Sequence, residues 1–112
     1  MGTPLRVLIV EDSELDALML VLELNQGGYE PLHEQVETID AVRAALRDKA
    51  WDIILCDYHL SGFNGLQVLS IVKEMGCDVP FILISGAIGE ELAVEAMKAG
   101  AHDYIMKDRR QR

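Results

Sequence analysis

The stretch that decides the fold is WDIILCD, residues 51–57, in which an apolar run ends on the acid Asp57. A similar run, RVLIVED, covers residues 6–12, and a third, PFILIS, covers residues 80–85. Continuous runs of β-branched and other apolar residues are typical of strands buried on both faces of a parallel sheet. The sequence therefore predicts three central strands, each followed by polar residues.

Weaker strands and helices fill the intervals between these runs. Residues 29–36 are more polar, which indicates an edge strand, and residues 103–107 read as a fifth strand. Because strand and helix alternate, we expect an α/β domain whose parallel sheet carries helices on both faces. Helices are predicted at about residues 13–25, 39–50, 64–75 and 89–99, with Ser13 and Thr38 as amino-terminal caps and residues 58–63 as a loop.

Length and charge narrow the class of protein. A chain of 112 residues, half of them hydrophobic, forms one globular domain rather than a disordered tail. The net charge of −9 argues against nucleic acid as a direct partner. The sequence has no run long enough to span a membrane and no signal peptide, so we expect a cytoplasmic protein without a membrane partner. Cys56 and Cys77 form no metal or disulfide motif and are expected to be buried, reduced thiols.

Polar residues at the strand ends form the candidate site. In open parallel sheets, chemistry gathers at the carboxyl ends of the strands, where the sequence places Glu11, Asp12, Asp57, Ser85 and Lys107. Carboxylates about 4 Å apart repel by about 4 kcal/mol at an effective dielectric of about 20. One lysine does not balance three acids, so the set predicts a site for Mg²⁺, an ion that prefers oxygen ligands.

Each of these residues also has a purely structural interpretation. Asp12 alone could be a helix cap, Asp57 and Ser85 could be polar stops after apolar runs, and Lys107 could be a solvated surface residue. The conjunction of polar groups at the same end of four strands favours the functional interpretation.

The sequence resembles the phosphoacceptor receiver domain of two-component response regulators. The resemblance rests on LIVEDS at residues 8–13, on Asp57 with LSGFNG at residues 60–65, on ILISG at residues 82–86, and on AGAHDYIMK at residues 99–107. It implies a flavodoxin-like, doubly wound sheet with strand order 2-1-3-4-5. It also implies a phosphoacceptor signalling domain that catalyses only its own phosphorylation and dephosphorylation.

The resemblance assigns a role to each site residue. Asp57 would take the phosphoryl group from the histidine of a partner kinase. Asp12, Asp57 and the backbone carbonyl of His59 would ligate Mg²⁺, for which Mn²⁺ would substitute, and Glu11 would act through a metal-bound water. The phosphoryl oxygens would be held by Ser85 and Lys107.

The resemblance further implies a switch and two tuning positions. Ser85 would move toward the phosphoryl group and draw Tyr104 inward. His59 and Ala87 would tune the lifetime of the acyl phosphate. The family usually carries proline where Ser61 stands, and a second proline, in a cis peptide, where Asp108 follows Lys107.

The end of the chain departs from the pattern as well. A receiver usually closes with a fifth helix, for which residues 108–112 leave only one turn. We therefore expect residues 1–112 to be a single receiver domain truncated after its fifth strand. The uncovered sheet face is expected to self-associate.

Partners and alternative functions remain open from the sequence. The expected partners are a sensor histidine kinase or a histidine phosphotransfer protein, and an output or kinase domain after residue 112. One alternative is a phosphorylation-independent interaction module. Another is an aspartate-based phosphohydrolase, which is less favoured because such enzymes usually carry a second acid where His59 stands. A flavin or nucleotide binder is weaker still, since the acids at 11–14 would repel phosphate.

Overall fold

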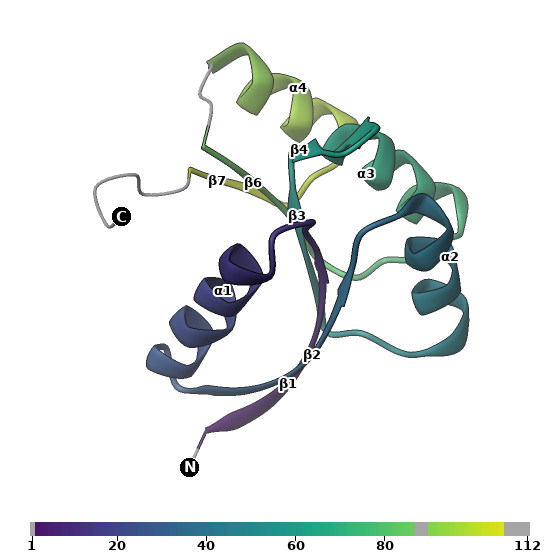
Figure 1. Cartoon of the computed structure of the whole chain (residues 1–112). Coiled ribbons are helices and arrows are strands. Elements are labelled where there is room, and N and C mark those ends of the chain that lie inside the picture. Colours follow the sequence, from purple (N-terminus) through teal and green to yellow (C-terminus); the bar gives the residue numbers. More distant parts are fainter. Residues whose placement is uncertain (1, 87–89, 107–112) are drawn as a thin grey trace.

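Five parallel strands form the central sheet, in the order β2-β1-β3-β6-β7 (Figure 1). The computed structural model describes residues 2–86 and 90–106. Counted along the chain, the order of these five strands is 2-1-3-4-5, which confirms the predicted topology and places the polar residues 29–36 at an edge. The strands are β1 (Thr3–Val10), β2 (Tyr29–Val36), β3 (Ile53–Asp57), β6 (Phe81–Ser85) and β7 (Asp103–Met106).

Helices cover both faces of this sheet. In the described part of the chain, α1 (Glu14–Gln26) packs on one face, while α2 (Ile39–Asp48), α3 (Gly65–Glu74) and α4 (Glu90–Ala99) pack on the other (Figure 1). The predicted caps are confirmed, since the Ser13 hydroxyl accepts from the Asp16 amide at 3.2 Å and the Thr38 hydroxyl accepts from the Ala41 amide at 3.0 Å.

A small hairpin occupies the segment that the sequence analysis predicted to be a loop. β4 (His59–Leu60) pairs antiparallel with β5 (Phe63–Asn64), so the prediction of a loop over residues 58–63 was wrong in this part. Gly62 closes the turn with a φ of 89°, a conformation that side chains other than glycine rarely adopt. Two-residue strands are too short to show a period in the sequence.

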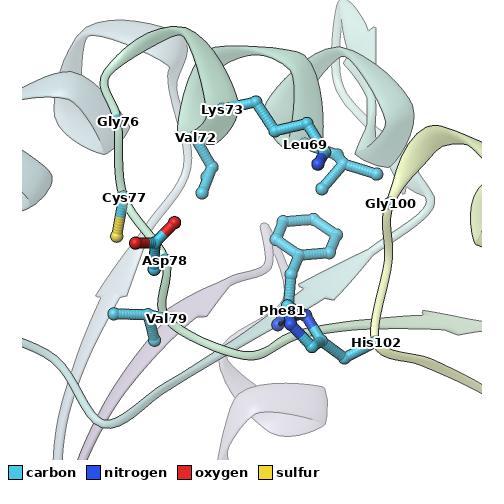
Figure 2. A pocket seen from close by; sticks show the side chains of 10 residues that line it. All are labelled: Leu69, Val72, Lys73, Gly76, Cys77, Asp78, Val79, Phe81, Gly100 and His102. Atoms are coloured by element: carbon cyan, nitrogen blue, oxygen red, sulfur yellow. Dashed lines mark hydrogen bonds between the residues drawn. The ribbon is translucent and has the colours of Figure 1, made fainter.

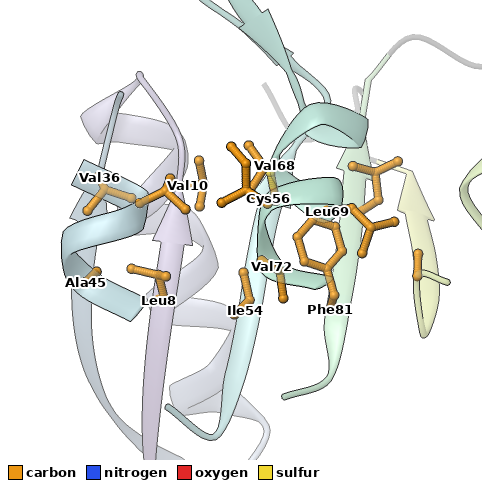
Figure 3. Packing of buried hydrophobic residues seen from close by; sticks show 14 of the residues in the cluster. Leu8, Val10, Val36, Ala45, Ile54, Cys56, Val68, Leu69, Val72 and Phe81 are labelled. Atoms are coloured by element: carbon orange, nitrogen blue, oxygen red, sulfur yellow. The ribbon is translucent and has the colours of Figure 1, made fainter. Parts of the chain in front are cut away.

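Two apolar clusters lie on opposite sides of the sheet. The larger cluster packs alternate residues of β1, β3 and β6, such as Leu8, Ile54 and Phe81, against α2 and α3 (Figure 3). The smaller cluster packs Ile9, Leu55 and other intervening residues against α1. Because successive side chains of a strand point to opposite faces, the alternation also determines the face of the sheet on which each residue at a strand end lies.

The α1 side of the domain exposes a group of large apolar residues. On α1 these are Leu15, Leu18, Met19 and Leu22, which are 40–67% exposed although Ala17 and Val21 of the same helix are buried. On β7, Ile105 projects to this same face of the sheet and is 46% exposed. Within the described ranges, none of the helices is both long and apolar enough to cross a membrane.

Candidate functional site

Three carboxylates converge at the carboxyl end of the sheet. Glu11 and Asp12 follow β1, Asp57 ends the neighbouring strand β3, and each of the three offers an oxygen within 4.8 Å of the others'. The predicted acid cluster is therefore present. Glu11 is 2% exposed and Asp57 is 8% exposed, so two of the charges lie in the protein interior.

The position of Glu11 is fixed by hydrogen bonds around it. Its amide donates to the Val36 carbonyl at 3.1 Å, and its own carbonyl accepts from the Gln35 side chain at 2.7 Å. The Glu11 carboxylate accepts from the Ser13 amide at 3.2 Å, at the start of α1. These three bonds hold Glu11 in place between β2 and the start of α1.

Asp12 is tied to the β4–β5 hairpin. The Ser61 hydroxyl and the Ser61 amide both donate to Asp12 Oδ2, at 2.8 and 3.1 Å. These bonds, the hydroxyl bond first, hold the pKa of Asp12 below its usual range against the opposing effect of burial. Asp12 precedes the Ser13 cap rather than serving as the cap itself, so the interpretation of Asp12 as a helix cap is wrong.

Asp57 lies where β3 passes into the hairpin and α3. The Tyr58 amide donates to the Ile84 carbonyl at 2.8 Å, and the Gly65 amide donates to the Tyr58 carbonyl at 2.9 Å. A Cβ atom on Gly65 would lie 2.9 Å from the Asp57 carbonyl oxygen and against the Leu83 side chain. Only glycine fits at the start of α3 without displacing the Asp57 backbone or the Leu83 side chain.

The two cysteines differ in their surroundings. Cys56 is fully buried in the larger cluster, on the opposite face of the sheet from the Asp57 side chain, and its thiol donates to the Asp57 backbone carbonyl at 3.3 Å. Burial, with the charges of Asp57 and Glu11 adding to it, raises the pKa of Cys56 well above its usual range. Cys77 is half-buried, and both cysteines are free. The predicted buried thiol is confirmed in full for Cys56 only.

Ser85 and Tyr104 share one face of the sheet. Ser85 ends β6 and is fully buried, while Tyr104 is a half-buried residue of β7 that pairs with Leu83 and packs on the larger cluster. Since Leu83 and Ser85 are two residues apart on one strand, their side chains project to the same face. Tyr104 is thus on the face from which Ser85 would move.

The remaining predicted residues lie in different places. His59 is exposed on β4, with its ring edge-to-face on Tyr58 at a centroid distance of 4.9 Å. Lys107 and Ala87 lie outside the described residues, as does the peptide between Lys107 and Asp108.

The acid cluster fits a divalent cation of the magnesium type. An octahedral ion with bonds of about 2.1 Å holds its ligand oxygens roughly 3–4 Å apart. Oxygens that already lie within 4.8 Å of one another need small movements to reach such spacing. The donors are all carboxylates, the ligand class that hard cations prefer.

A separate pocket lies at the opposite end of the sheet (Figure 2). His102 stabilises its wall, because its Nδ1 accepts from the Phe81 amide at 3.0 Å and its own amide donates to the Phe81 carbonyl at 2.8 Å. The acids of the cluster are not among its lining residues, so it is distinct from the acid cluster. The pocket has a volume of about 310 Å³ and is lined by Leu69, Val72, Lys73, Gly76, Cys77, Asp78, Val79, Phe81, Gly100 and His102.

Two contacts at the site are missing from the sequence-based prediction. Ser61 was noted only as a departure from a usual proline, and Gly65 only as part of a motif. The sequence did contain one signal for a side-chain role at residue 61. Serine stands there in place of the usual proline, and serine can donate hydrogen bonds that proline cannot.

Comparison with known proteins places the chain in a family. The family model for the response regulator receiver domain matches residues 7–112, and the chain therefore belongs to this family. It is a receiver phosphoacceptor domain of a two-component system, a signalling domain rather than a true enzyme, and its class implies a histidine kinase as partner.

Similar curated proteins are longer than this chain. The phosphate regulon transcriptional regulatory protein PhoB of Klebsiella pneumoniae is 34% identical over 104 residues, covering 91% of this chain and 44% of that protein. The transcriptional regulatory protein ZraR of Salmonella typhimurium is 32% identical over 101 residues, covering 90% of this chain and 22% of that protein. The chain thus spans less than half the length of these relatives.

Solved receiver structures share the fold. The non-phosphorylated HemR receiver domain from Leptospira biflexa has a TM-score of 0.73 at 30% identity, with 91% of this chain and 81% of that one covered. The beryllofluoride-activated NtrC4 receiver domain dimer has a TM-score of 0.79 at 27% identity, with 92% and 84% covered.

Proposed function

We propose that Asp57 is the phosphoacceptor of this receiver domain. The main support is that a carboxylate oxygen of Asp57, at the end of the central strand β3, lies within 4.8 Å of carboxylate oxygens of Glu11 and Asp12. A carboxylate oxygen of Asp57 attacks the phosphorus of a phosphohistidine, the P–N bond breaks, and the released imidazole takes up a proton. The product is an acyl phosphate on Asp57.

The acid cluster holds Mg²⁺ in this proposal. Asp12 and Asp57 ligate the ion with the backbone carbonyl of His59, and Glu11 acts through a bound water; Mn²⁺ is expected to substitute. The ion supplies charge neutralisation for the oxygens of the transferring phosphoryl group. The residues contribute by orientation, since hydrogen bonds fix both Glu11 and Asp12 before any ion binds.

Ser85 and Lys107 bind the phosphoryl oxygens in this proposal, and the packing of the Tyr104 ring changes when the phosphoryl group is present. Ser85 is fully buried and follows Ile84, the residue that pairs with Asp57. Its position at the end of the strand next to β3 supports a role in binding a phosphoryl group on Asp57. When Ser85 turns toward a phosphoryl oxygen, space opens on the face where Tyr104 packs, and the population shifts toward an inward ring.

Acetyl phosphate and beryllofluoride test the assignment of Asp57. With Mg²⁺, the wild-type chain should gain the mass of one phosphoryl group from acetyl phosphate, and Asp57→Asn should gain none. Asp78→Asn is the matched control because it removes an exposed acid at the other end of the sheet. An adduct that survives Asp57→Asn would refute the assignment. A wild type that forms no adduct would favour an interaction module, and turnover of a phosphate ester would favour a phosphohydrolase.

His59 and Ala87 are proposed to tune the lifetime of the acyl phosphate. His59 is exposed two residues after the acceptor, where its ring can shield or orient an attacking water. His59→Ala should change the autodephosphorylation rate measured by loss of labelled phosphate. An unchanged rate would remove the role of His59.

The partners follow from the class and from the length of the relatives. We propose that a sensor histidine kinase or a histidine phosphotransfer protein donates the phosphoryl group, that an output or kinase domain follows in the parent protein, and that this domain contacts no nucleic acid itself. We place it in the cytoplasm, where thiols such as Cys56 and Cys77 stay reduced.

The exposed apolar residues of α1 and β7 support self-association. Leu15, Leu18 and Leu22 stand on one side of α1, away from the buried Ala17 and Val21, and exposed apolar residues gathered in this way are typical of an interaction surface. We expect a concentration-dependent dimer by sedimentation velocity, weakened in Leu18→Gln. A strictly monomeric wild type at high micromolar concentration would contradict this.

A further inference from the structure

We propose that Ser61 is a positioning residue for metal binding, which holds the Asp12 carboxylate in the orientation in which it ligates a divalent cation. The proposal deepens the Mg²⁺ site proposed above and rests on it. Its basis is the pair of hydrogen bonds that joins the β4–β5 hairpin to the residue after β1.

Both donors of Ser61 converge on a single oxygen. The hydroxyl lies 2.8 Å and the amide 3.1 Å from Asp12 Oδ2. Two donors on one oxygen restrict rotation of the carboxylate and so fix where both of its oxygens lie. Metal-ligating carboxylates are commonly held in this way by a protein donor outside the ligand set.

The support beneath Ser61 is rigid. Ser61 stands in the two-residue turn between the paired strands β4 and β5, and Leu60 and Phe63 on either side pack against the larger apolar cluster. At the base of the hairpin, Asn64 and Gln67 form a reciprocal capping box at the start of α3. The backbone of Ser61, and with it the amide donor, is therefore held by the hairpin and does not simply follow Asp12.

The same bonds could instead compete with a cation for Asp12, and the geometry favours positioning. If Asp12 had to leave Ser61 to reach an ion, its oxygens would lie away from the other acids while the bonds are made. In the structure, Asp12 offers an oxygen within 4.8 Å of those of Glu11 and Asp57 with both bonds in place. The two Ser61 bonds and the clustering of the acid oxygens therefore coexist in one arrangement.

The turn permits a graded set of substitutions at this position. Gly62 has the positive φ found at the second central position of a type II turn, whose first central position accepts proline. Leu60 is extended in β4, as a residue before proline must be. Ser61→Pro thus keeps the turn and removes both donors, Ser61→Ala removes only the hydroxyl, and Ser61→Thr keeps both.

The test is the Mg²⁺ dissociation constant of the full 112-residue chain, measured by titration calorimetry without a phosphodonor. We expect Ser61→Thr to stay within about twofold of wild type, Ser61→Ala to bind several-fold more weakly, and Ser61→Pro to bind about tenfold more weakly or worse. Ser70→Ala, which removes an exposed serine hydroxyl from the middle of α3, should bind as wild type does. Circular dichroism verifies the fold of each variant.

A second readout needs no metal. In the metal-free protein, the amide of residue 61 should exchange with solvent faster in Asp12→Ala than in wild type, because Asp12→Ala removes the oxygen that accepts from this amide. Mg²⁺ binding by folded Ser61→Ala that is as tight as that of wild type, or tighter, would overturn the positioning role while leaving the proposed metal site intact. A wild type that binds no Mg²⁺ would overturn the metal site itself, and the role of Ser61 with it.

Discussion

The acid cluster should make the metal-free domain less stable than it would be without Asp57. At an effective dielectric of about 20, two charges 4.8 Å apart repel by about 3 kcal/mol, and Asp57 faces two such charges. Solvent near half-exposed Asp12 weakens one pair, and Asn forfeits other contacts that the Asp57 carboxylate makes. We therefore expect Asp57→Asn to raise the free energy of unfolding by about 2 kcal/mol, or the melting temperature by roughly 5–10 °C.

Urea and thermal unfolding in EDTA, followed by far-UV circular dichroism, measure this change. Adding Mg²⁺ at about ten times its dissociation constant should stabilise the wild type by about 1.4 kcal/mol and Asp57→Asn far less, because the variant has lost a ligand. Asp78→Asn is the control: it changes the net charge from −9 to −8 in the same way, but at an exposed acid. The m-values should agree across the three proteins.

Three results would refute the reasoning. If Asp57→Asn is less stable than wild type in EDTA, the repulsion is smaller than the contacts that Asp57 makes, and no cation is needed to relieve it. If Mg²⁺ stabilises both proteins equally, the ion binds elsewhere. Equal stabilisation by the two asparagine variants would mean that net charge, rather than the cluster, is responsible.

Three further predictions concern a glycine, the two cysteines and Asp12. Gly65→Ala should cost about 1–3 kcal/mol of stability in urea unfolding, because its Cβ meets backbone 2.9 Å away, whereas Gly27→Ala, with no atom nearer than 3.5 Å, should be neutral. Iodoacetamide should alkylate native Cys77 and spare Cys56, whose pKa is raised by burial, and equal labelling by mass spectrometry would contradict this. The carboxyl of Asp12 should titrate by NMR below the usual value of about 3.9, so its contribution to stability is present above that pH and is lost as the pH falls through the lower folded-state pKa.

The sheet and the acid cluster could be predicted because one rule governs both. Apolar runs identified the central strands, and parallel strands bring their carboxyl ends together, so Glu11 and Asp57 had to meet once the topology was inferred. The start of β1 was placed three residues late, at Arg6, because Thr3 to Leu5 join the strand by pairing with β2 rather than by burial. Periodicity in the sequence reports burial only.

The link between Ser61 and Asp12 could not be predicted in this way. The two residues are 49 positions apart, and their contact depends on where a two-residue turn places a hydroxyl. The tight fit of Gly65 against the Asp57 carbonyl is a matter of atomic distances of the same kind. Such contacts depend on how the hairpin packs. A hairpin of two-residue strands has neither a hydrophobic period nor a strand propensity strong enough to be predicted from the sequence.

Repulsion among the three carboxylates lowers the stability of the metal-free protein and also favours binding of a cation. Residues that ligate the ion and residues that position its ligands should therefore respond differently to substitution. Removing the charge of a ligand such as Asp57 relieves repulsion, so the metal-free protein becomes more stable as the cation binds more weakly. Removing a donor such as the Ser61 hydroxyl relieves nothing, because the charge on Asp12 remains and loses a hydrogen bond. Ligands and positioning residues should therefore shift metal-free stability in opposite directions while both weaken Mg²⁺ binding. The sign of that shift distinguishes a group that holds the ion from a group that holds its ligand.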